Sequence, residues 1–104
     1  MTESPSELFD ALEEHFPDVI EQMEYEFTSH QFIEKLSQMQ LALYIELLSE
    51  YNENGHRPFQ SVHSGIAKRL KNNWKHLVEH LDTDTKSENI SGNYNSAAIW
   101  HKVR

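Results

Sequence analysis

The sequence predicts a single, mostly helical α+β domain, and three observations support this class. The chain has 104 residues, which is the length of one domain. Apolar residues recur three or four positions apart through much of residues 8–70, as they do along a buried helix face. Residues 97–103 are β-branched and aromatic, which is typical of a strand. A hydrophobic fraction of 38% is enough for one modest core.

The N-terminal segment is expected to form a short acidic helix. Ser4 is a candidate cap, and a proline at position 5 is tolerated in a first helical turn. Apolar residues at helical spacing continue to Phe16, so we expect a helix over 4–16 that ends before Pro17. Residues 17–27 are expected to be partly helical and to end in a short extended piece.

Two helices are expected between residues 28 and 51. Thr28 and Gln31 have the spacing of a capping box, which would begin the first of them. Ser37 and Gln40 repeat this spacing and are expected to cap the second. The second helix is expected to bury a wide apolar face, made of Leu41, Leu43, Tyr44, Ile45, Leu47, Leu48 and Tyr51.

A break around Asn54-Gly55 and Pro58 separates a third amphipathic helix. Its apolar positions lie four apart, at Val62, Ile66 and Leu70. Its outer positions are expected to carry His63, Lys68, Arg69 and Lys71. Asn72-Asn73 then interrupts the helical pattern.

The segment 74–82 fits either a helix or a strand, because its apolar residues satisfy both periods. Residues 82–96 are polar and rich in turn-forming types, and 97–103 is the expected closing strand. Within that strand Trp100 is expected to fill part of the core.

The charge is unevenly distributed. The formal net charge is −8, which by itself disfavours a protein that grips phosphate backbones. Residues 1–53 carry thirteen acids and only Lys35 as a base, a net of −12. Residues 54–78 carry five bases and no acid. DNA binding is therefore compatible with the charge only if the acids and the basic helix lie on opposite sides.

Several classes of protein are excluded or disfavoured. The absence of cysteine excludes disulfides, zinc–thiolate sites and cysteine nucleophiles, and it favours a reducing compartment. No apolar run has the length of a membrane span, and the acidic N-terminus is unlike a signal peptide, so a cytoplasmic protein is expected. No phosphate-binding glycine loop or nucleophile elbow is present, so no catalytic residue and no cofactor are assigned.

Residues 76–80 match the H-x-x-E-H pattern of inverted zinc proteases. On a helix, His76 and His80 would share one face with Glu79 as the base. Such enzymes need a further downstream ligand and a larger scaffold than this chain provides. We therefore interpret the match as chance and assign no metal.

The order of elements resembles a winged helix-turn-helix domain over about 27–103, with three helices, a polar loop and a closing strand. The resemblance implies a winged-helix-like three-helix core with a C-terminal β-hairpin in a domain 27–104, plus an acidic helical extension, 1–26, packed on that core. It also implies that helix 61–71 enters the DNA major groove and that the hairpin loop, about 84–95, touches DNA. The implied DNA-binding residues are His63, Lys68, Arg69, Lys71, Asn72, Lys75 and Lys86.

The function expected on this basis is non-enzymatic: binding of double-stranded DNA, or assistance to a DNA-bound complex, as in transcriptional regulation. The alternative is a protein–protein interaction module whose acidic N-terminal face binds a basic protein, without nucleic-acid binding. A further alternative for the basic segment is that its charges pair within the fold. A homodimer is compatible with DNA binding, because many such domains pair to contact two half-sites. No membrane partner is expected.

Overall fold

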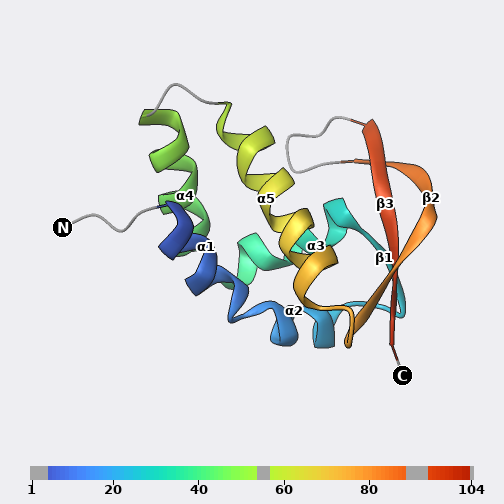
Figure 1. Ribbon diagram of the computed structural model, residues 1–104. Helices are drawn as coiled ribbons and strands as arrows, with labels where there is room; N and C mark the ends of the chain where they lie inside the picture. Colours follow the sequence, from blue (N-terminus) through green and yellow to red (C-terminus); the bar gives the residue numbers. More distant parts are fainter. Residues whose placement is uncertain (1–4, 54–56, 89–93, 104) are drawn as a thin grey trace.

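The computed structural model describes residues 5–53, 57–88 and 94–103, with the backbone alone for 5, 53, 82–88 and 94–96 (Figure 1). The fold is mostly helical α+β, which confirms the predicted class. In chain order the elements are α1 (Pro5–Glu13), α2 (Phe16–Gln22), β1 (Glu26–Thr28), α3 (Ser29–Met39), α4 (Leu41–Glu53), α5 (Pro58–Asn73), β2 (Val78–Glu88) and β3 (Tyr94–Lys102).

The N-terminal segment forms two helices rather than the single expected one. α1 ends at Glu13, and α2 begins at Phe16. Pro17 lies in the first turn of α2 and not beyond the end of a helix. The prediction of a helix over 4–16 that ends before Pro17 was therefore wrong. The N–H groups of a first helical turn have no partner within the helix, so a proline, which has no N–H, can begin a helix as well as follow one. The expected extended piece is present as β1.

α3 begins at the predicted capping box. The Thr28 hydroxyl accepts a hydrogen bond from the Gln31 backbone N–H at 3.1 Å, and the Gln31 side chain accepts one from the Thr28 N–H at 2.9 Å. The predicted cap at Ser37 is wrong: its hydroxyl donates to the Glu34 carbonyl at 2.7 Å within α3. A single residue, Gln40, separates α3 from α4.

α4 buries only part of its apolar surface in the core. Tyr44 and Leu47 are buried, whereas Leu41 and Ile45 are 55% and 51% exposed. The expectation that Leu41 and Ile45 face the core was therefore wrong. Leu43, Leu48 and Tyr51 are partly buried against the core.

The sheet has the order β1-β3-β2, with antiparallel pairing on both sides of β3. The segment 74–82, whose sequence fitted either a helix or a strand, is a turn followed by β2, which begins at Val78. The expected loop over 84–95 was too long, because β2 continues to Glu88 and β3 begins at Tyr94. Backbone pairing with β3 satisfies the hydrogen bonds of this polar stretch regardless of its side chains. Residues 89–93, within that expected loop, lie outside the described part of the chain.

One core joins the helices to the sheet. α1 packs against both α4 and α5, and the sheet lies at the opposite end of the molecule from α4 (Figure 1). Segment 1–26 contributes to this core, together with α3, α4, α5 and the strands: its buried side chains are Leu8, Phe9, Leu12, Phe16, Val19 and Ile20. Trp100 is 2% exposed, as predicted, and its Nε1 donates to the Ser29 hydroxyl at 2.8 Å. None of the helices in the described ranges has the length and apolar character needed to cross a bilayer.

Candidate nucleic-acid interface

α5 has one buried and one polar, exposed face. Val62, Ile66 and Leu70 are at most 1% exposed, which confirms their predicted burial. The helix is longer than the expected 61–71, because Pro58 provides a suitable first turn. The exposed side chains on the polar side are Gln60, Ser64, Lys68, Lys71 and Asn72. This face is basic and carries no acidic side chain.

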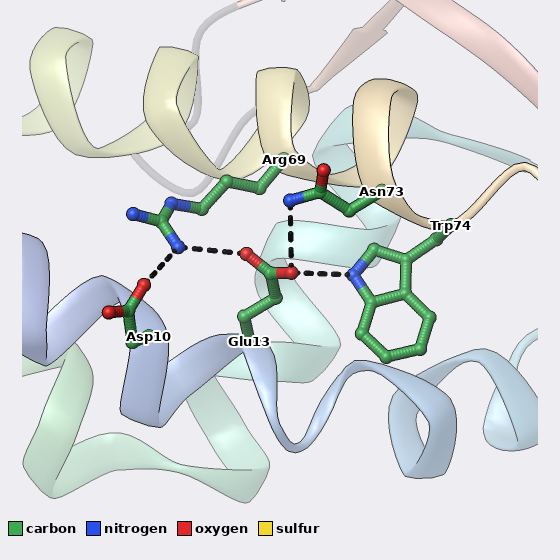
Figure 2. Close-up of polar contacts among 5 residues, drawn as sticks. All are labelled: Asp10, Glu13, Arg69, Asn73 and Trp74. Carbon is green, nitrogen blue, oxygen red and sulfur yellow. Dashed lines mark hydrogen bonds and ion pairs between the residues drawn. The ribbon is translucent and has the colours of Figure 1, made fainter.

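Arg69 does not lie on that exposed face. Its Nη1 donates to an Asp10 carboxylate oxygen at 2.7 Å and to a Glu13 carboxylate oxygen at 2.8 Å (Figure 2). Its guanidinium also lies over the Phe9 ring, 5.1 Å from the centroid. Burial lowers the pKa of Arg69, but the hydrogen bonds and charges of Asp10 and Glu13 outweigh it and raise that pKa above its ordinary value. The expectation that Arg69 faces DNA phosphate was therefore wrong. Arg69 joins α5 to α1.

Glu13 is the centre of this contact. Besides Arg69, its carboxylate accepts hydrogen bonds from the Asn73 amide at 3.1 Å and the Trp74 indole N–H at 3.2 Å (Figure 2). The Glu13 side chain is only 16% exposed, whereas that of Asp10 is 68% exposed. Two donors from the C-terminal part of α5, and a third from Trp74 directly after it, thus converge on one carboxylate of α1.

His63 also differs from its expected outward position. Its Nε2 lies 2.6 Å from the Tyr44 hydroxyl, and the two rings stack at 5.8 Å. The Phe59 ring meets His63 edge-on at 5.8 Å. Burial, and then the charge of His30, lower the pKa of His63 to about 4, while burial raises the pKa of Tyr44 to about 12. At neutral pH both groups are therefore uncharged, and the hydrogen bond between the Tyr44 hydroxyl and His63 Nε2 links α4 to α5.

We expect the free energy of unfolding to fall as the pH is lowered from about 6.5 to about 4. His63 has a lower pKa in the fold than in the unfolded chain, so the unfolded chain takes up this proton first. The stabilisation is complete above about pH 6.5 and is lost as the pH falls towards 4. Urea unfolding between pH 7.5 and 4 measures it.

The matched variants for this pH prediction are His63→Gln and His76→Gln. His63→Gln should give a flatter pH dependence than the wild-type protein. His76→Gln, which changes an exposed histidine in the turn after α5, should not. Identical pH dependence in all three proteins would contradict the role assigned to His63.

The remaining predicted residues are placed in two ways. Lys75 is exposed in the turn that follows α5, close to the end of the basic face. Lys86 lies in β2 opposite Ser96 of β3, and its side chain is outside the described part. A hollow adjoins the C-terminal end of α5 and is lined by Lys71, Lys75, Val78, Glu79, His80 and Val103.

Gln60 and Ser64 were missed by the sequence analysis. Together with Lys68 they are spaced four apart, so one side of the helix was already marked as polar. These polar residues have the same spacing as the apolar Val62 and Ile66, which lie on another side of the helix. The predicted candidates were instead the basic side chains of this region and the adjacent Asn72.

The helical arrangement that a zinc-protease motif requires does not form. His76 lies in a turn, and Glu79 and His80 are neighbours in β2, where successive side chains point to opposite faces. Within the described ranges, no three histidine or acidic side chains are grouped to hold a metal. The chain matches no protein-family model, no curated protein and no solved structure. Its function is therefore inferred from its own residues.

Proposed function

We propose that the protein binds double-stranded DNA through the exposed face of α5, as a regulator or as an accessory to a DNA-bound complex. The observation that carries this proposal is the placement of Lys68 and Lys71 on an exposed helix face without acids, followed by exposed Lys75. Lysines that neutralise phosphates release bound counterions, which is the main source of sequence-independent affinity.

The polar side chains on the same face supply hydrogen-bonding groups. A major groove admits an α-helix, and amide side chains pair with adenine edges there. Asn72 and Gln60 carry such amides, and Ser64 carries a hydroxyl that accepts or donates. In this proposal the lysines position α5 on the phosphate backbone of the DNA, and these three side chains contact the edges of its bases.

The order of elements supports the same proposal. α3, α4 and α5 precede a β2–β3 hairpin, and β3 also pairs with β1. This order resembles winged-helix domains, in which the helix before the hairpin enters the major groove. α5 occupies that position. In this proposal Lys86, in the hairpin, is a further candidate for contact with the DNA backbone.

The contacts of α1 address the objection raised by the net charge of −8. Asp10 and Glu13 are engaged by Arg69, which lies about 100° around the helix from Lys68. These acids therefore face the flank of α5 and not its exposed face. Their field still lowers affinity, so we expect binding that is weak and strongly dependent on salt. A cytoplasmic location, also a proposal, is consistent with this function.

The test is fluorescence anisotropy with a labelled duplex of about 25 base pairs at several salt concentrations. We expect Lys68→Ala/Lys71→Ala/Lys75→Ala to weaken binding at least about tenfold and to reduce the salt slope by about three. Lys35→Ala, which removes a lysine from α3, is the matched control and should bind as the wild type does. An absence of binding at low salt, or equal binding by the triple variant, would overturn the proposal.

A further inference from the structure

We propose that α4 binds a basic amphipathic helix of a partner protein. The binding surface, called here the α4 face, consists of Leu41, Ala42, Ile45, Glu46 and Ser49, all of which are exposed. Leu41 and Ile45 lie one helical turn apart on the same side, and each exposes more than half of its surface.

The apolar character of this face extends beyond two residues. Leu48 is partly buried and lies three residues after Ile45, so it continues the same line along α4. Met39, at the end of α3 just before α4, is 38% exposed. Single exposed apolar residues are common, but a line of them at helical spacing is the apolar face that an amphipathic helix presents to a partner.

The charge of α4 selects the partner. α4 contains three glutamates and no basic residue, and Glu46 is exposed directly beside Ile45. Residues 1–53 carry a net charge of −12, so pairing two copies through this face would bring like charges together. A helix with apolar residues at i, i+4 and i+7 and lysine or arginine on its flanks complements both properties. Its long basic side chains would also cover apolar surface with their methylene groups.

This surface is independent of the proposed DNA interface. None of its residues lies in α5, and the neighbouring Tyr44 already faces α5 through His63. Loss of DNA binding therefore leaves this proposal intact, and both surfaces can be occupied at the same time. A DNA-bound copy would then recruit the partner.

The probe is a synthetic 18-residue amphipathic peptide. It has leucines at helical spacing along one side, called here the leucine seam, and lysines on both flanks of that seam. A peptide with the same seam and glutamate flanks, and a scrambled lysine peptide, are the controls. We expect only the lysine-flanked peptide to bind, with a Kd below about 1 mM by isothermal titration calorimetry. Leu41→Ser/Ile45→Ser should weaken that binding at least about tenfold, and Glu46→Lys should weaken it as well.

Val103→Ser is the matched control, because Val103 is 47% exposed but follows β3 at the sheet end of the molecule. Thermal unfolding should be nearly unchanged in all variants, since the substituted side chains are exposed. Absence of peptide binding, or equal binding by Leu41→Ser/Ile45→Ser, would overturn the proposal. So would a wild-type dimer in sedimentation that these two substitutions dissociate, because the occupant would then be a second copy.

Discussion

Gly65→Leu is expected to destabilise the protein by about 3 kcal/mol, the upper part of the range for overpacked cores. A Cβ at position 65 would lie 2.5 Å from Cζ and 2.8 Å from Cε1 of Phe9. The Phe9 ring has little freedom to move, because Phe9 is 6% exposed and its ring packs against both the Tyr51 ring and the Arg69 guanidinium. The glycine is thus required for the close approach of α1 to α5. Chemical denaturation measures the loss.

Two further variants separate crowding from helix propensity. Gly65→Ala gains about 1 kcal/mol of helix propensity and loses more to the contact with Phe9, so we expect a net loss of about 1 kcal/mol. Ser64→Leu places the same side chain on the neighbouring exposed position and should change stability by less than about 0.5 kcal/mol. If Gly65→Leu and Ser64→Leu behave alike, the packing of Phe9 on Gly65 is not as described.

Glu13→Ala is expected to cost about 2–3 kcal/mol of stability. The substitution removes the acceptor of three hydrogen bonds, from Arg69, Asn73 and Trp74, at a side chain that is 16% exposed. Arg69 keeps Asp10, but that partner is 68% exposed, and exposed pairs contribute about 0–1 kcal/mol. Thermal or urea unfolding measures the loss.

The control for Glu13→Ala is Glu14→Ala, the adjacent and exposed acid, which should cost less than about 0.5 kcal/mol. The indole N–H resonance of Trp74 gives a second, local measurement. It should shift in Glu13→Ala and stay in place in Glu14→Ala, because Glu13 accepts a hydrogen bond from that group. Equal stability of the two variants would show that the Glu13 contacts contribute nothing.

Elements with strong local signals were predictable from the sequence. The capping box at Thr28 and the apolar series of α5 depend on spacings within one or two turns, and both are present. The burial of individual side chains in α4 was less predictable. Its apolar residues occupy most of the helix circumference, so periodicity alone did not reveal that Tyr44 is buried and Ile45 is exposed. The packing of α1 and α5 decides that, and it is a tertiary property.

The candidate site was predictable to a similar degree. The sequence located the basic helix and its exposed lysines, Lys68 and Lys71. It did not separate them from Arg69, because the partners of Arg69 lie 56 and 59 residues away in α1. His63 was misplaced for a similar reason: its partner Tyr44 is 19 residues away. Local pattern identifies which side chains are charged or polar, but only the fold decides which of them are already engaged.

The central position of β3 governs the order in which the domain can be completed during synthesis. β1 is made early, yet its antiparallel partner is β3, and Phe27 pairs with Trp100. The helices α1 to α5 of the described ranges are therefore translated before β1 has a strand to pair with and before Trp100 can enter the core. Until residues 94–102 emerge, the nascent chain is a set of helices with an unpaired strand and an incomplete core. Such intermediates expose apolar surface and are prone to aggregation, so this domain is expected to close only after β3 has been made.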